Sequence, residues 1–224
     1  MVIKRSIQIV IAVMVIIIGA IDTMAIEEAK YKVLEKNNRF EIRDYVPHIL
    51  AETIVEGDLE GAGNKAFNRL FRYISGENRS RTKVEMTAPV SQQSMGEKIK
   101  MTAPVGQRRV QEKWAVSFMM PASYTIETLP EPEDRNITLR QVPARRMAAV
   151  RYSGFWSNVR YLRYKSELEL WIKEKGLTIL GDPIWARYNP PFTPWFLRRN
   201  EILIPVYTGA DLNSGNSTPQ DFPF

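Results

Sequence analysis

A pattern of short strands, one long amphipathic helix and further strands runs twice along this chain, and it restricts the possible folds more than any other feature. In the first half, alternating apolar residues predict strands over Tyr31–Glu35, Phe40–Tyr45 and Ile49–Val55. Asn37-Asn38 separates the first two strands as a hairpin turn. Apolar residues then recur at steps of three and four, which predicts a helix over Ala62–Ile74 that ends before Gly76.

The second half repeats this order. It contains two predicted strands, a helix and a closing strand, over Asn136–Val142, Met147–Tyr152, Ser157–Lys175 and Glu201–Val206. Three extended segments lie between the halves, at Val84–Val90, Lys98–Val105 and Trp114–Met120. A duplication of this kind predicts an α+β fold in which two similar halves share one sheet system.

The two ends of the chain differ from the domain between them. Lys4 and Arg5 precede the apolar stretch Ile7–Ile21, and small residues follow it, as in a secretory signal. At about 1.5 Å per residue the stretch falls short of a hydrocarbon core of roughly 30 Å. Residues 1–25 are therefore either a signal peptide or, with the apolar stretch continued over residues 7–26, a membrane anchor. We expect an exported, periplasmic or otherwise extracytoplasmic domain over residues 29–206 and a disordered tail over residues 207–224.

The composition excludes several kinds of site. The chain has no Cys, so disulfides and thiolate chemistry are impossible, and its one His, His48, rules out a two-histidine metal site. The net charge of +6 is spread along the chain, whereas a nucleic-acid partner normally goes with tight basic clusters or a motif. A serine triad would need His48 as its base, and nothing favours a Glu-Tyr pair built on Glu85. We expect neither a nucleic-acid partner nor enzyme activity.

An identical five-residue segment occurs twice, as Met86-Thr87-Ala88-Pro89-Val90 and as Met101-Thr102-Ala103-Pro104-Val105. Each proline removes a backbone donor and marks the edge or end of a strand. With these segments, the chain resembles the SOUL haem-binding family from about Ala29 to Val206. The other matching stretches are Tyr31-Lys32-Val33-Leu34, Glu41-Ile42-Arg43 before Tyr45, Tyr73-Ile74-Ser75-Gly76, Phe118-Met119-Met120-Pro121, Tyr188-Asn189-Pro190-Pro191 and Arg198-Arg199-Asn200-Glu201.

This resemblance implies both a fold and a ligand. The fold is a distorted β-barrel of two repeated halves with one long helix packed on each, similar to the effector-binding domains of bacterial regulators. The ligand is haem or a related tetrapyrrole, held in a shallow hydrophobic groove between the first helix and the loop before the last strand. Such a disc needs apolar surface against its faces and cations near its propionates.

On the first helix, the resemblance and the apolar stripe suggest Phe67, Leu70 and Phe71 as the groove wall, with Arg69 and Arg72 at its rim. The same apolar residues, with Ile74, are also what a helix facing the core presents. Of the four apolar residues Phe67, Leu70, Phe71 and Ile74, two are expected to line the groove, while the other two pack in the core.

The second wall is expected in the loop from Tyr188 to Phe196, which three prolines stiffen. Phe192 and Trp195 either contact a ligand or fold back over the core. Arg198 pairs either with propionates or with acidic residues of this chain. For the iron, His48 is the one available histidine, but no motif identifies it as an axial ligand, so no metal ligand is assigned.

These observations favour a non-catalytic module that binds haem or another tetrapyrrole as an exported carrier, buffer or sensor. The alternative is an effector-binding or protein-interaction domain that uses the same groove for another amphipathic ligand or a partner. Contact with a membrane is expected only through the N-terminal segment, where that segment is retained.

Overall fold

The computed structural model describes residues 26–81 and 96–207, and all structural statements refer to those residues. The predicted signal or anchor, the predicted strand Val84–Val90 and the tail from residue 208 lie outside them. Within the described ranges, no helix is long and apolar enough to cross a membrane.

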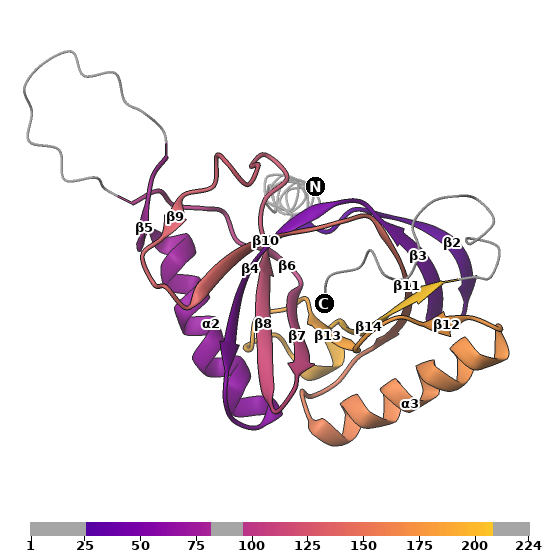
Figure 1. Cartoon of the computed structure of the whole chain (residues 1–224). Coiled ribbons are helices and arrows are strands. Elements are labelled where there is room, and N and C mark those ends of the chain that lie inside the picture. The colour runs from indigo at the N-terminus through magenta and orange to yellow at the C-terminus, as the bar shows by residue number, and fades with distance from the viewer. Residues whose placement is uncertain (1–25, 82–95, 208–224) are drawn as a thin grey trace, which may run out of the picture.

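A single large sheet forms the centre of the molecule (Figure 1). Its hydrogen-bonded order is β10-β4-β8-β7-β13-β14-β11-β3-β2, with β12 paired to β14, and its neighbouring strands among the described residues run antiparallel. The strands are β2 Tyr31–Asn37, β3 Phe40–Tyr45, β4 His48–Val55, β7 Val105–Val110, β8 Lys113–Met119, β10 Ile137–Val142, β11 Arg145–Tyr152, β12 Thr178–Ile179, β13 Ile184–Arg187 and β14 Asn200–Tyr207.

Two small two-stranded sheets complete the strand pairing. β1 Glu27–Glu28 pairs in parallel with β6 Thr102–Ala103, and β5 Asn78–Arg79 pairs with β9 Glu131–Pro132. The predicted α+β class is therefore confirmed. The closed barrel that the resemblance implied is not confirmed, because the order of paired strands in the described residues begins at β10 and ends at β2 without joining them.

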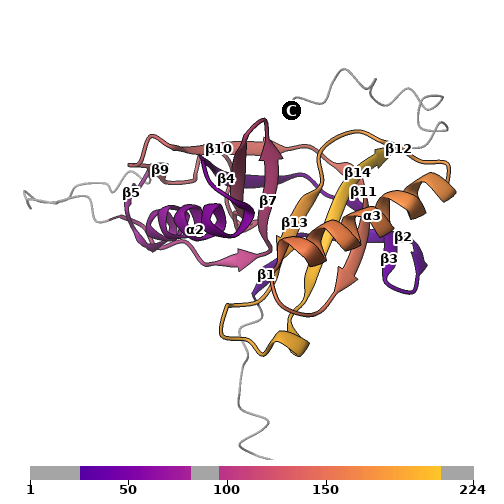
Figure 2. The same ribbon diagram turned by 90° about the horizontal axis from the view of Figure 1, so that it is seen from below.

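Each half of the sheet carries one helix, as the duplicated pattern predicted. α2 spans Leu59–Ser75 and packs on β4 and β8, whereas α3 spans Asn158–Glu174 and packs on β11 and β14. Figure 2 shows the two helices over separate parts of the sheet. The two halves exchange strands. β2 and β3, from the first half of the sequence, join the part of the sheet under α3, and β10, from the second half, joins the part under α2.

The ends of α2 follow from its capping residues. The Asp58 side chain accepts a hydrogen bond from the Gly61 backbone N–H at 2.7 Å, so the helix begins three residues before the predicted Ala62. Gly76 ends the helix with φ of 119°, a left-handed conformation that glycine adopts without a steric cost. Between these ends, Ala66 and Leu70 are fully buried on the face that meets the sheet.

The buried residues form two clusters, one on each face of the sheet. The larger lies between the sheet and the two helices. The smaller lies on the opposite face and is built from Tyr45, Ala103, Met147, Ala149, Ala186, Tyr188 and Leu203. One face of the sheet thus packs against helices, while the other carries aromatic, small and, as described below, charged side chains.

Candidate functional site

On α2, three of the predicted wall residues differ in how they meet solvent. Leu70 is fully buried in the core. Phe67 is half-buried and meets Phe118 of β8 edge-on, with ring centroids 5.3 Å apart. Phe71 stacks on Phe67 at 5.8 Å and is 46% exposed. The two phenylalanines therefore continue the core outward to the surface, and Leu70 contributes packing rather than a ligand surface.

The two arginines predicted at the rim of this wall already have acidic partners. Arg69 Nε lies 3.0 Å from Asp134 Oδ2, and its Nη1 donates to Thr53 Oγ1 at 2.8 Å. Arg72 Nε lies 3.5 Å from Glu77 Oε2. A propionate would have to compete with these carboxylates for either guanidinium group.

The loop between β13 and β14 presents its aromatic side chains outward. Phe192 is 85% exposed, and Trp195, in the short 3₁₀ helix η1 (Trp195–Leu197), is about half exposed. The Trp195 ring stacks on Phe155 with centroids 5.5 Å apart, and the Trp195 carbonyl accepts a hydrogen bond from the Gly154 N–H at 2.9 Å. The loop is thereby attached to the segment before α3, and its aromatics do not fold back over the core.

The basic and phenolic residues of this loop are engaged within the chain. Arg198 Nε donates to the Thr193 carbonyl at 2.8 Å, and its Nη2 donates to the Pro191 carbonyl at 2.5 Å, so this guanidinium closes the loop on itself. Tyr188 is buried, and its hydroxyl donates to Glu201 at 2.9 Å. Burial, followed by the charge of Glu201, raises the pKa of Tyr188 well above its ordinary value. Tyr188 therefore belongs to the interior and not to an exposed wall.

Sequence reasoning missed Arg187, the residue just before this loop. Its guanidinium lies 5.2 Å from the ring centroids of both Trp156 and Trp185, and its Nη2 donates to Gln107 Oε1 at 3.2 Å. No carboxylate of the described residues pairs with it, and its buried Nε has no hydrogen-bond partner there. Burial lowers the pKa of Arg187 to about 10, so the group is a cation at neutral pH without a counter-charge.

Arg187 also links the two predicted walls. A Cβ at Gly63, in the first turns of α2, would lie 2.9 Å from Arg187 Nη2, so glycine is what lets the guanidinium lie against the helix. The Trp156 ring that Arg187 contacts is contacted as well by Arg198, at 4.7 Å. The structure thus connects the start of α2 to the loop, whereas no ring contact, ion pair or hydrogen bond of the described residues joins Phe71 or Arg72 to it. Nothing in the sequence marks an arginine that lacks an acidic partner.

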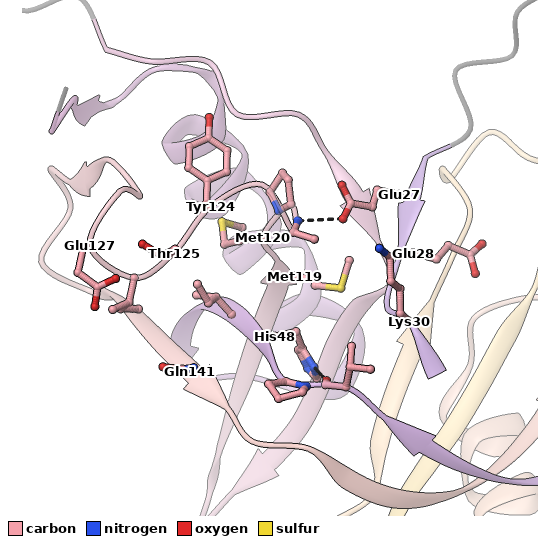
Figure 3. Close-up of a pocket in the computed structure, with 16 residues that line it drawn as sticks. Glu27, Glu28, Lys30, His48, Met119, Met120, Tyr124, Thr125, Glu127 and Gln141 are labelled. Carbon is pink, nitrogen blue, oxygen red and sulfur yellow. Dashed lines mark hydrogen bonds between the residues drawn. The ribbon is translucent and has the colours of Figure 1, made fainter. Parts of the chain in front are cut away.

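A separate cavity of about 430 Å³ contains His48 (Figure 3). Met119, Met120 and Tyr124 line it too, but none of the nine residues predicted for the groove does. His48 Nδ1 lies 3.0 Å from the Val46 carbonyl oxygen, so the neutral ring carries its proton on Nδ1. Burial, followed by the charges of Arg145 and Arg140, lowers the pKa of His48.

Solved structures with a similar fold are distant in sequence. A hydrolase from Listeria innocua aligns with a TM-score of 0.52 and 12% identity, over 78% of this chain and 94% of that chain. The EcmrR C-terminal domain aligns with a TM-score of 0.50 and 13% identity, over 80% and 98%. EcmrR bound to DNA aligns with a TM-score of 0.52 and 14% identity, over 75% of this chain and 57% of that one. At such identities the likeness concerns the fold alone.

No curated protein matches this chain. A family model described as SOUL heme-binding protein does match it, over residues 26–205. The matched range includes both helices, the whole large sheet except the last residues of β14, and the loop between β13 and β14. The chain therefore belongs to the SOUL heme-binding family, a non-enzymatic family that binds haem or tetrapyrroles in general.

Proposed function

We propose that this protein binds haem or a related tetrapyrrole without converting it, on the surface between the start of α2 and the loop that connects β13 to β14. Family membership carries the proposal, since it implies haem binding at the level of the family. We further propose an exported carrier, buffer or sensor that residues 7–26 hold at a membrane. The apolar stretch Ile7–Ile21 supports that part.

The described residues fit the chemistry of such a ligand. The stacked rings of Trp195 and Phe155 offer exposed apolar surface for a flat macrocycle. Arg187 offers a cation that no carboxylate of the described chain neutralises, and its Nε still lacks an acceptor. A propionate that pairs with this guanidinium would displace no existing ion pair of the described residues.

This arrangement changes the roles of the predicted cations. Arg187 replaces Arg69 and Arg72 as the proposed propionate contact, because those two are paired with Asp134 and Glu77. Arg198 keeps a supporting role, since its bonds to the loop carbonyls hold the loop that carries Trp195. The macrocycle, when bound, supplies its own chemistry, while these side chains only hold and orient it.

Titration of the protein with haem tests the proposal. Binding is expected to shift the Soret band and to quench Trp fluorescence at micromolar haem. Trp195→Ala should raise the dissociation constant roughly tenfold, the equivalent of about 1.4 kcal/mol, because a stacking surface is lost. Leu170→Ala is the control, since Leu170 is an exposed apolar residue of α3 away from the loop. No spectral change in the unsubstituted protein would contradict the proposal.

The alternative, an effector-binding or protein-interaction domain, uses the same exposed loop. It is supported by Phe192, whose ring is 85% exposed on a loop closed by Arg198. Under this alternative, Trp195→Ala abolishes capture of a partner, while the unsubstituted protein gives no Soret shift. Measurements of the Soret shift and of partner capture, made on the unsubstituted protein and on Trp195→Ala, therefore distinguish the two functions.

A further inference from the structure

Beyond the stacked pair of Trp195 and Phe155, the loop carries three further exposed apolar side chains, one of which, Phe196, meets the Trp195 ring edge-on at 5.5 Å. Phe192 is 85% exposed, Phe196 is 58% exposed and Leu197 is 64% exposed. We call these three residues the apolar tip. Single exposed apolar side chains are common, but three on one short loop are a concentration of apolar surface that usually meets another surface.

The described chain begins beside this loop. Glu28 of β1 pairs with Arg199, with Oε2 and Nη1 2.7 Å apart, and Arg199 lies two residues after Leu197. Glu27 is fixed as well, because its carboxylate accepts a hydrogen bond from the Ala122 N–H at 2.8 Å. Figure 2 shows β1 and the loop that contains η1 at the same end of the molecule. The start of the domain is thus held at the base of the loop.

The sequence before this point is apolar from Ile7 to Ile21. The proposed anchor, residues 7–26, ends where the described chain begins; were it to end at Ile21, the five residues to Ile26 would reach no more than about 18 Å even fully extended. A bilayer that holds Ile7–Ile21 therefore lies close to the end of the domain that carries the loop. Aromatic side chains are enriched where proteins meet the headgroup region of a bilayer, and Arg side chains reach its phosphates.

We propose that the apolar tip inserts into the membrane surface and is a second membrane contact beside the N-terminal segment. This inference rests on the anchor in the proposed function, but not on haem binding. The tip and the anchor together hold the domain with one end against the lipid. A peptide linker alone would leave the orientation of the domain free.

The absence of Cys makes a direct test possible, because single-cysteine variants of the full chain carry a label at one position only. Phe196→Cys is labelled with a polarity-sensitive fluorophore and reconstituted in vesicles of neutral and anionic phospholipids. Leu170→Cys is the matched control, since Leu170 is 62% exposed on α3. Retention of the protein on the vesicles after an alkaline wash reports the anchor independently of either label.

The expected result is a blue-shifted emission from position 196, with protection from aqueous iodide and quenching by lipid-borne quenchers. The label at position 170 should stay in water. A chain retained by the vesicles with position 196 in water overturns the tip proposal and leaves the anchor standing. Release of the chain by the wash overturns both. Protection that grows with the protein-to-lipid ratio shows that a second copy covers the tip, which also overturns the proposal.

Discussion

Arg43 and Glu201 form a buried ion pair that joins β3 to β14 across the intervening strand β11. Arg43 Nη1 donates to Glu201 Oε2 at 2.7 Å and its Nη2 donates to Oε1 at 3.2 Å, and both side chains are almost completely buried. Arg199 and the Tyr188 hydroxyl donate to the same carboxylate. Such a pair contributes little net stability by itself, but the loss of one partner leaves the other charge buried and alone.

The first prediction concerns the removal of this carboxylate. Glu201→Gln should lower the free energy of unfolding by about 3–5 kcal/mol, because Arg43 and Arg199 both lose a buried carboxylate and Arg43 keeps only Glu41, at its Nε. Urea denaturation followed by circular dichroism measures the change. Glu56→Gln is the control, since Glu56 pairs with Lys113 at the surface and should leave the urea midpoint unchanged. Equal midpoints for both variants would contradict the prediction.

The second prediction follows from the pKa of Glu201. Burial would raise this pKa, but the hydrogen bonds and charges of Arg43 and Arg199 outweigh it and hold the pKa below the ordinary value of 4.5. A carboxyl group with a lowered folded-state pKa contributes stability above the unfolded-state pKa and loses it as the pH falls through the folded-state value. The urea concentration at the midpoint should therefore decrease as the pH is lowered below about 4.5. This decrease should be less steep in Glu201→Gln than in the unsubstituted protein. Parallel pH profiles would exclude Glu201 as the source.

Most of the secondary structure could be predicted because it depends on local patterns. The periodicity from Ser157 to Lys175 gives α3 to within one residue at each end. By contrast, β13, over Ile184–Arg187, was not predicted, because four residues that begin with Ile and end with Arg carry no alternation long enough to detect. The order of the strands was beyond prediction as well, since β2 and β3 join the strands of the other half through tertiary packing.

In the predicted site too, local patterns could be predicted and tertiary contacts could not. The apolar stripe of α2 was predicted correctly, but the stripe alone does not show which of its side chains reach the surface. The structure separates Leu70, which is buried, from Phe71, which is exposed. For charged residues a sequence gives the residue type but no partner. In the structure, distant strands pair Arg69 with Asp134, whereas Arg187 meets no carboxylate among residues 26–81 and 96–207, and neither outcome follows from the residue types alone.

The third prediction separates packing from ligand contact on α2. Leu70→Ala should lower the free energy of unfolding by about 2–5 kcal/mol, because it leaves a cavity in the core. Phe71→Ala removes a ring that is 46% exposed and should cost clearly less. Urea unfolding of both variants gives the comparison. A larger loss for Phe71→Ala than for Leu70→Ala would show that the helix is packed differently.

The fourth prediction concerns Arg187 as the propionate contact. Arg187→Gln should raise the dissociation constant for haem roughly 10- to 100-fold, because a charge-assisted hydrogen bond of about 1.5–3 kcal/mol is lost. Arg163→Gln, at the exposed Arg163–Glu167 pair on α3, is the control and should bind haem as the unsubstituted protein does. Protoporphyrin dimethyl ester has no free carboxylates. It should therefore bind to the unsubstituted protein and to Arg187→Gln with the same affinity. A loss of ester binding in Arg187→Gln would mean that the substitution disturbs the surface itself.

The last prediction asks whether the iron matters. His48 lines a cavity that contains none of the residues proposed for haem, and its Nδ1 is engaged with the Val46 carbonyl. Affinity for the macrocycle should therefore come from stacking and from Arg187, and iron-free protoporphyrin should bind within a few-fold of haem. His48→Ala should leave both affinities and the position of the Soret band unchanged, as measured by absorbance titration. A Soret shift that disappears in His48→Ala would assign the axial ligand to His48 and move the bound macrocycle to the cavity of Figure 3. In that event Trp195→Ala should have no effect on binding, so the two substitutions together decide between the two locations.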